Sequence, residues 1–321
     1  MALSRDEWLV ARQQYIGSTD ITRLLKLTPA AWGRDSDVFK DKTDPFPGAD
    51  DLSITDVRTW GLKLEPVIAQ AYSEVVGKPV QKWDEDYVSP WPFEDRPHVA
   101  CSPDYFIGDM ADRATTTLVE CKNVVAWKRD EWGLGKGENA EGQVPIHYLR
   151  QVHWQIGCTK TAGAVICALI GGSDFCYYDV QPDPEWFAMA AEYAEDWYHA
   201  HVAMVVAPPI ESRSDIVVRA PLENGLVLTA NDGLQHFVER YQQVRADIDA
   251  SKEELDWLGA QLCMHMGDIY DTVNRRDGKT LATWKANKHG KRTLRVSKPD
   301  KADDGTLEAS SRYDIHERLE V

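Results

Sequence analysis

The sequence predicts an α/β fold with a central sheet flanked by helices, followed by a C-terminal extension made of a helix and a β-hairpin. Segments with the apolar pattern of strands alternate along the chain with segments whose apolar residues recur at helical spacing. After the Pro208-Pro209 pair the pattern changes to a long helical stretch and a basic hairpin. We therefore expect one domain over residues 1–210 and an extension over residues 211–321.

The N-terminal part is expected to be mainly helical. Residues 5–25 show helical turns interrupted at Ile16-Gly17-Ser18-Thr19-Asp20, where hydroxyl residues and an acid after a glycine are typical of a loop that caps the next helix. Residues 28–56 are rich in Pro, Gly and Asp and are interpreted as a loop. Residues 60–76 have helical spacing and are followed by a glycine, which predicts a helix that carries Glu65 in its first turns.

Two strands are expected next. Residues 99–108 are short and apolar and end in a turn. Residues 117–124 alternate between apolar and polar side chains, which places Glu120 and Lys122 on the same side of a strand.

The remaining part of the domain is expected to complete the sheet and cover it. Residues 128–144, rich in glycine and charge, are interpreted as a mobile linker, and Pro145 opens a helix. Residues 162–170 form a continuous apolar run that suits a central strand. A helix over residues 184–205 closes this part of the chain.

The extension has two expected elements. Apolar residues between 234 and 262 fall near helical spacing, which predicts one long helix or two helices broken near Ser251. Residues 281–285 and 292–296 flank a polar turn and predict a basic hairpin.

Composition and charge limit the function classes. No stretch approaches the ~20 apolar residues of a membrane span, and the N-terminus lacks an apolar signal core, so the cytoplasm is expected. The six cysteines form no CxxC pair, which argues against a zinc framework, an iron–sulfur nuclease and a disulfide pattern.

The net charge is −16, but residues 275–301 carry +8 and leave −24 for the rest. Such asymmetry suits a protein that binds a polyanion on one face.

Asp104, Glu120 and Lys122 suggest the chemistry of phosphodiester cleavage. Carboxylates bind hard divalent cations such as Mg²⁺, which polarise phosphoryl oxygens and lower the pKa of a bound water. A lysine two residues after the glutamate can position or deprotonate that water, and its pKa should fall beside two cations. The Glu120-Cys121-Lys122 triplet alone is a weak signal, because such triplets also occur on solvated strand edges.

The triplet gains weight from four other motifs. In chain order the set is Trp8 and Arg12 before Ile16-Gly17-Ser18-Thr19-Asp20, Glu65, Ser102-Pro103-Asp104, Glu120-Cys121-Lys122, and Tyr148 to Val152 with Gln151. This set resembles the phage recombination exonucleases, the lambda-exonuclease or YqaJ-type branch of the PD-(D/E)xK nuclease superfamily. The resemblance covers about residues 5–205 and implies a restriction-endonuclease-like core with a central mixed β-sheet.

The resemblance implies a role for each matching residue of the catalytic site. Asp104 and Glu120 would bind the first metal, helped by the backbone carbonyl of Cys121, and Glu65 would reach the second. Lys122 would activate the attacking water. Gln151 would orient Lys122 or that water, whereas Gln155 is interpreted as structural.

A second group of residues is assigned to DNA. Arg12, Thr19 and Ser102 match the positions that hold the 5′-phosphate, although the family usually has serine at Thr19. The other expected DNA contacts are open to a packing or surface interpretation: Tyr148, Trp127, Trp132, Lys128, and the hairpin residues Lys285, Lys288, Lys291, Arg292 and Arg295.

The implied function is a Mg²⁺-dependent exonuclease, with two ions and Mn²⁺ as a possible substitute, that digests the 5′-phosphorylated strand of linear duplex DNA from 5′ to 3′. The resemblance further implies a homotrimer that hands the 3′ overhang to a single-strand annealing protein in phage recombination. A PD-(D/E)xK endonuclease and a catalytically inactive DNA-end-binding module are the alternatives.

Overall fold

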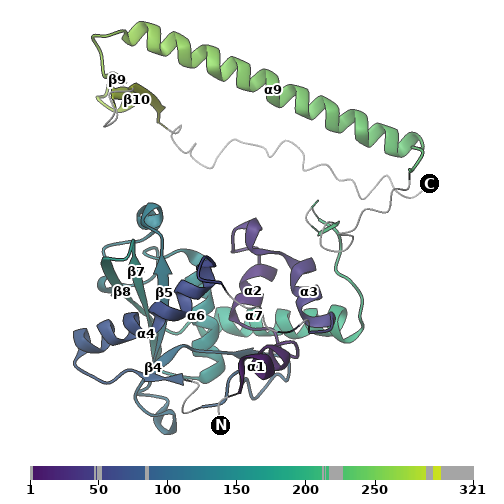
Figure 1. The fold of residues 1–321 in the computed structure, drawn as a ribbon, viewed down its shortest axis with the longest axis vertical. Coiled ribbons are helices and arrows are strands. Elements are labelled where there is room, and N and C mark those ends of the chain that lie inside the picture. The colour runs from purple at the N-terminus through teal and green to yellow at the C-terminus, as the bar shows by residue number, and fades with distance from the viewer. Residues whose placement is uncertain are drawn as a thin grey trace. The chain divides into compact units, whose positions relative to one another are not determined.

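The protein was analysed as a computed structural model that describes residues 3–46, 48, 53–83, 87–211, 213, 215–216, 227–286 and 292–297. The chain divides into two compact units, residues 1–223 and residues 224–321 (Figure 1). The boundary expected after residue 210 falls inside the first unit. Lys26 forms an ion pair with Glu211, and the backbone N–H of Glu211 donates to Asp215, so residues just beyond 210 are tied to the first unit.

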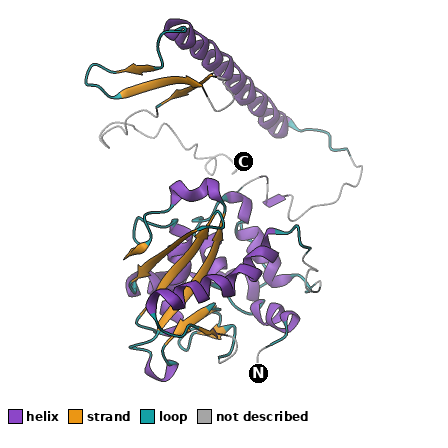
Figure 2. Cartoon of the chain, turned by 60° about the vertical axis from the view of Figure 1, so that its left-hand side comes forward, coloured by secondary structure: helices purple, strands orange, loops and turns teal. Residues whose placement is uncertain are grey.

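A six-stranded mixed sheet forms the centre of the first unit, in the order β1-β4-β5-β7-β8-β6. Figure 2 shows the orange strands of this sheet with purple helices around them. The pairs β5·β7 and β6·β8 are parallel and the other three pairs are antiparallel, which confirms the expected mixed sheet flanked by helices. The strands are β1 (Gln81–Lys82), β4 (Tyr105–Ile107), β5 (Thr117–Val124), β6 (Lys136–Asn139), β7 (Gly163–Ile170) and β8 (Asp174–Val180).

Helices α4 (Val57–Val76) and α6 (Ile146–Thr159) pack against opposite faces of strand β5. Val119 joins the core beneath α4, whereas its neighbour Leu118 joins the core beneath α6. Because successive strand residues face opposite ways, Glu120 and Lys122 lie on the α6 side. Helix α4 ends as expected at Gly77, whose φ of 65° lies in the left-handed region that a glycine adopts without strain.

Several other helices of the first unit form a second core beside the sheet. Ile21 of α2, Trp154 of α6 and Ala194 of α7 belong to this core, which holds the N-terminal segment against the middle of the chain. Besides α6, the elements that contribute to it are α2 (Ser18–Leu24), α3 (Asp35–Thr43), α7 (Pro184–Trp197), the π-helix η4 (Tyr198–Ala203), β2 (Trp91–Pro92) and β3 (Ala100–Cys101). Helix α1 (Arg5–Arg12) precedes them and has no buried residue.

Two segments that were expected to be irregular contain regular structure. The expected loop 28–56 contains the 3₁₀ helix η1 (Ala30–Trp32) and α3, whose first turn is capped by Asp37 and whose Val38 is fully buried. The expected linker 128–144 contains the end of η3 (Ala126–Glu131) and strand β6. Strand β6 is short and rich in glycine and charge, and it is held by pairing to the distant β8, so its own sequence does not reveal it.

The expected strand 99–108 is also different. It is two strands in different sheets, β3 and β4, separated by Ser102-Pro103-Asp104. Pro103 has no N–H to donate and interrupts strand pairing there.

The second unit contains helix α9 (Asp232–Met266) and a sheet in the order β11-β10-β9. Helix α9 is continuous through Ser251, which decides between the one-helix and two-helix predictions. The expected hairpin is confirmed as β10 (Thr280–Ala286) and β11 (Arg292–Val296), and β9 (Thr272–Asn274) adds an unexpected third strand. Among the described residues, no helix is both long and apolar enough to cross a membrane.

Candidate active site

Asp104 and the Glu120-Cys121-Lys122 triplet meet at the junction of β4 and β5. The carboxylate of Asp104 accepts a hydrogen bond from the backbone N–H of Cys121 at 2.9 Å. The antiparallel pairing of β4 with β5, which sets Tyr105 opposite Val119, explains this contact. The strand register therefore fixes the carboxylate of Asp104 beside the triplet.

Both carboxylate oxygens of Glu120 are held in place. Oε1 accepts from Lys122 Nζ at 2.5 Å and from Gln151 Nε2 at 2.7 Å, and Oε2 accepts from Gln155 Nε2 at 2.8 Å. Gln151 and Gln155 are one turn apart on α6, so one helix face supplies both amides. Gln151 Oε1 also accepts from Lys122 at 3.1 Å. Glu120 is buried, and these contacts orient it rather than leaving it free to rotate.

Two pKa shifts describe the electrostatics of this cluster. Burial, and then the negative charges of Glu120 and Glu65, raise the pKa of Asp104 well above its ordinary value. Burial lowers the pKa of Lys122, but the nearby carboxylates of Glu120 and Asp104 outweigh it and raise that pKa above its ordinary value. Without a cation Lys122 is therefore protonated, in contrast to the lowered pKa expected beside two metal ions.

The donor set fits a hard divalent cation. Glu65 lies on α4, and its charge acts on Asp104 together with that of Glu120. The negative charges of Glu120 and Glu65 disfavour the ionisation of Asp104, so a divalent cation would stabilise the charged form of this carboxylate, and carboxylate oxygens are the ligands that Mg²⁺ prefers. Burial raises the pKa of the Cys121 thiol, so this side chain is a poor thiolate ligand.

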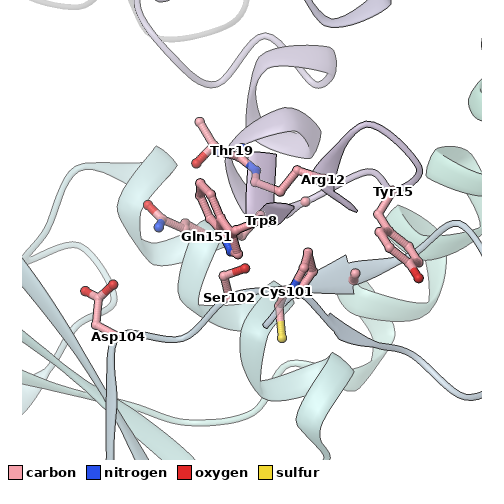
Figure 3. Close-up of a pocket in the computed structure, with 12 residues that line it drawn as sticks. Trp8, Arg12, Tyr15, Thr19, Cys101, Ser102, Asp104 and Gln151 are labelled. Carbon is pink, nitrogen blue, oxygen red and sulfur yellow. The ribbon is translucent and has the colours of Figure 1, made fainter. Parts of the chain in front are cut away.

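A pocket of about 160 Å³ adjoins the carboxylate cluster (Figure 3). Asp104 and Gln151 belong to its wall, so the pocket and the cluster share two residues. Figure 3 shows Asp104 and Gln151 at one end of the pocket and Tyr15 at the other. The predicted phosphate-binding residues Arg12, Thr19 and Ser102 all line this pocket.

Arg12 is held by aromatic stacking. Its guanidinium lies 4.7 Å from the ring centroid of Trp8, and Arg5 lies over the same ring at 4.6 Å. The indole N–H of Trp8 donates to the hydroxyl of Ser89 at 3.1 Å, which fixes the ring. Arg12 lines the pocket, whereas Arg5 does not.

Asp20 and Lys42 form an ion pair next to the residues that line the pocket, and the importance of Lys42 was not expected from the sequence. Lys42 Nζ lies 2.7 Å from Asp20 Oδ2, which also accepts from the backbone N–H of Gly17 at 3.0 Å. Burial is the largest influence on Asp20 and would raise its pKa, but the charges of Lys42 and Arg12 and the hydrogen bonds from Lys42 and Gly17 together outweigh it, and the pKa falls to about 2. Lys42 lies in a segment with the composition of a loop, and no sequence signal pointed to it.

The aromatic residues near the site divide into buried and exposed ones. Trp132 is buried and packs against Tyr148, whose ring centroid lies 5.0 Å from Lys122 Nζ. Trp127 on η3 is 82% exposed, and Lys128 beside it forms an ion pair with Glu131. Of the two tryptophans considered for DNA contact, Trp132 thus belongs to the core and Trp127 has the exposure that base stacking requires.

The basic residues of the hairpin belong to the second unit. Arg292 donates to the carbonyls of Gly267, Tyr270 and Trp284 and to Asp271, so its guanidinium is used within that unit. Lys285 and Arg295 are exposed. Lys288 and Lys291 lie outside the described residues.

Comparisons with known proteins agree with the motifs. Residues 7–162 match the model of the YqaJ-like viral recombinase domain. The chain is 23% identical to the uncharacterized protein YqaJ of Bacillus subtilis (strain 168) over 313 residues, which cover 93% of this chain and 89% of the relative. The chain is also similar to two solved structures of the alkaline exonuclease LHK-Exo from Laribacter hongkongensis, one of them a complex with dAMP. The identity is 16% and the TM-score 0.47, and the match covers 62% of this chain and 93% of that one. The family resemblance inferred from the motifs is confirmed by the match of residues 7–162 to the YqaJ-like viral recombinase domain.

Proposed function

We propose that the chain is a Mg²⁺-dependent double-stranded DNA exonuclease that digests the 5′-phosphorylated strand from 5′ to 3′ and leaves 3′ overhangs for recombination by strand annealing. The observation that carries this proposal is the shared wall of the pocket and the carboxylate cluster. Asp104 and Gln151 contribute to both, so an anion held by Arg12 lies next to a cation-binding centre. An enzyme that cleaves only at a phosphorylated end needs this adjacency.

The proposed metal ligands are Asp104, Glu120 and the Cys121 carbonyl, with Glu65 for a second ion. When bound, two Mg²⁺ ions supply Lewis-acid polarisation of the phosphoryl group and lower the pKa of the attacking water. Mn²⁺ has similar ligand preferences and is proposed as a substitute.

The chain's own residues position the groups and move the proton. Lys122 is protonated while Glu120 and Asp104 carry uncompensated charge. Neutralisation of those carboxylates removes the cause of the raised pKa, so that the amine can then accept a proton from water. Gln151 forms hydrogen bonds with both Glu120 and Lys122 and so fixes the positions of these two side chains relative to each other. Arg12, Thr19 and Ser102 hold the terminal phosphate, and a guanidinium suits an anion at this position.

Helix α9 supports the proposal that the protein self-associates, as the homotrimer prediction requires. Residues 234, 241, 248, 255 and 262 are Leu, Tyr, Ile, Leu and Leu, and residues 237, 244 and 258 are Phe, Val and Leu. This is a seven-residue repeat with apolar a positions and mostly apolar d positions, where Ser251 is the polar exception between Val244 and Leu258. Such a repeat is the pattern that joins helices into coiled coils. Ile248 is 50% exposed and Leu255 71% exposed, so the stripe is uncovered within its own unit.

A strand-resolved time course on linear duplexes tests the function. With Mg²⁺ we expect mononucleotides from the 5′-phosphorylated strand, much slower digestion from a 5′-hydroxyl end, and no cleavage of covalently closed circles. Lys122→Ala should be inactive, whereas Lys78→Ala, at an exposed position with no proposed role, should retain the activity. Cleavage of circles would favour the endonuclease, and tight Mg²⁺-independent end binding without turnover would favour the inactive module. A single-strand annealing partner is expected to bind the 3′ overhang as it forms.

A further inference from the structure

We propose that His98, Glu195 and His199 form a binding site for a transition-metal ion such as Zn²⁺, distinct from the carboxylate cluster. One potential ligand atom from each residue lies within 4.8 Å of those from the other two. His98 precedes β3, Glu195 lies on α7, and His199 lies on η4, so the site joins segments that are about a hundred residues apart in sequence.

The ligand types indicate the class of ion. Two imidazoles and a carboxylate are a donor set that favours Zn²⁺, Co²⁺, Ni²⁺ or Cu²⁺ over Mg²⁺. Donor atoms about 2.0–2.2 Å from a tetrahedral Zn²⁺ lie roughly 3.5 Å apart. The three ligand atoms here lie within 4.8 Å of one another, and the side chain of His199, which is 60% exposed, is free to complete the approach. Three protein ligands leave the fourth position for water.

His98 is oriented as a metal ligand is usually oriented. Its ring stacks on Tyr198 with a centroid distance of 3.8 Å and an interplanar angle of 11°. Its Nδ1 lies 3.3 Å from the backbone carbonyl of Gln14, which can only accept a hydrogen bond. Nδ1 therefore carries the proton, and the lone pair of Nε2 is left to bind a cation. A carbonyl that fixes the tautomer of a metal-ligating histidine is a common supporting contact.

Glu195 is a buried carboxylate whose charge partner in the described structure is an exposed histidine. Its Oε2 accepts from the backbone N–H of His98 at 3.1 Å, and its Oε1 lies 3.1 Å from His199 Nε2. A buried carboxylate is costly unless it is paired with a positive charge. His199 supplies that charge only when it is protonated, whereas a divalent cation supplies it at any pH at which it binds.

The helix geometry gives an independent indication. Helix α7 changes to the π-helix η4 at Tyr198, between Glu195 and His199. Short π-helical turns are rare and occur frequently at functional sites. The turn sets the direction in which His199 leaves the helix relative to Glu195.

An ion at this place would stabilise the wall of the phosphate pocket. The backbone N–H of Ile16 donates to the carbonyl of His98 at 2.7 Å, and that of Ala100 donates to the carbonyl of Ile16 at 3.2 Å. Tyr15 and Gly17 on one segment, and Ala100 to Ser102 on the other, line the pocket. The ion therefore has a structural role, in which it fastens both segments to α7.

The test is metal binding to the chelator-treated full chain with Mg²⁺ in excess, so that the carboxylate cluster is occupied. Co²⁺ should bind in one equivalent with the visible absorption of a tetrahedral site, and Zn²⁺ should displace it. Zn²⁺ at 100 times its Kd should raise the Tm by about 5–10 °C. His98→Ala and His199→Ala should lose both signals. His201→Ala, on the same π-helix but bonded to the carbonyl of Val206, should keep them.

Two results would overturn the proposal. No Co²⁺ absorption and no Tm shift in the wild type would mean that Glu195 and His199 form only an ion pair. Unchanged binding in both histidine variants would place the ion elsewhere. His199→Ala removes an exposed side chain, so circular dichroism without metal should show a wild-type fold and keep the comparison valid. Because these readouts measure binding, they are independent of nuclease activity.

Discussion

The buried carboxylate of Asp20 and the buried ammonium of Lys42 lie 2.7 Å apart, and Asp20 also accepts from the backbone N–H of Gly17, which lines the proposed phosphate pocket. Lys42 also donates to the backbone carbonyl of Arg12 at 2.8 Å, so one side chain connects α1, α2 and α3. The pair therefore links the stability of the N-terminal segment to the shape of the pocket.

Lys42→Ala is expected to destabilise the protein by about 3–5 kcal/mol, because it leaves a buried carboxylate without its partner. The exposed Lys40, which lies 3.9 Å from Asp44, is the matched control, and Lys40→Ala should cost about 0–1 kcal/mol. Urea denaturation measures both. Equal effects would contradict the assigned role of Lys42. The folded-state pKa of Asp20 is depressed, so its contribution is present above the ordinary value of 3.8 and is lost as the pH falls towards about 2.

In the metal-free protein, the contribution of Asp104 to stability is expected to change with pH in the direction opposite to that of Asp20. Its pKa is raised in the folded state, so its contribution to stability is complete below the ordinary value of 3.8 and is lost as the pH rises through the folded-state pKa. In EDTA, the Tm should therefore fall as the pH rises from acid towards neutral. Asp104→Asn should reduce this fall while abolishing cleavage, and Mg²⁺ should reduce it in the wild type. A Tm profile that Asp104→Asn leaves unchanged would argue against this interpretation.

Arg12 and Arg5 provide a matched pair for the phosphate pocket. Both guanidinium groups stack on Trp8, but only Arg12 lines the pocket. Loss of a hydrogen bond to a charged group costs about 1.5–3 kcal/mol, which is about 10- to 150-fold in affinity. Arg12→Ala should lose this factor in KM for 5′-phosphorylated duplexes and change little for 5′-hydroxyl duplexes. Arg5→Ala should behave as the wild type, and similar losses in both variants would assign the effect to Trp8 packing instead.

A substitution at Gln155 tests whether its hydrogen bond to Glu120 orients this proposed metal ligand. Its Nε2 donates to Glu120, and its buried Oε1 has no hydrogen-bond partner among the described residues, so its polar atoms serve Glu120 alone. Gln155→Met keeps the volume and removes the donor, and we expect a 10- to 100-fold weaker apparent Mg²⁺ affinity, as for other groups that support metal ligands. Activity at saturating Mg²⁺ should largely recover. An unchanged Mg²⁺ titration would show that Gln155 is only a packing residue.

A substitution at Ile248 tests whether the apolar stripe of α9 joins copies of the protein. Ile248→Lys places a charge at an a position of the repeat and should shift the protein to a smaller species in analytical ultracentrifugation. Gln242 is exposed on the same helix outside the a and d positions, and Gln242→Lys should leave the mass unchanged. Identical sedimentation of all three proteins would exclude the stripe as an assembly surface.

The parts of the site that follow local periodicity could be predicted from the sequence. Strand alternation set Glu120 and Lys122 on one side, and one face of α6 presents Gln151 to both. The Lys42 ion pair and the pairing of β6 could not be predicted, because each depends on a partner distant in sequence and lies in a segment of loop-like composition. The basic pattern of the hairpin likewise did not reveal that the guanidinium of Arg292 forms hydrogen bonds with Gly267 and Asp271 of its own unit.

Ser102-Pro103-Asp104 separates β3 from β4, and it places Ser102 in the phosphate pocket and Asp104 in both the pocket and the carboxylate cluster. Two residues of extended chain span at most about 7 Å. Under the proposed function, Ser102 holds the DNA end and Asp104 binds the catalytic metal, and a short backbone segment with the rigid Pro103 in its middle separates them. This fixed separation sets the distance from the held end to the bond that is cut. The size of each product is then a property of the backbone, so pocket variants are expected to change the rate of release but not the length of the released fragment.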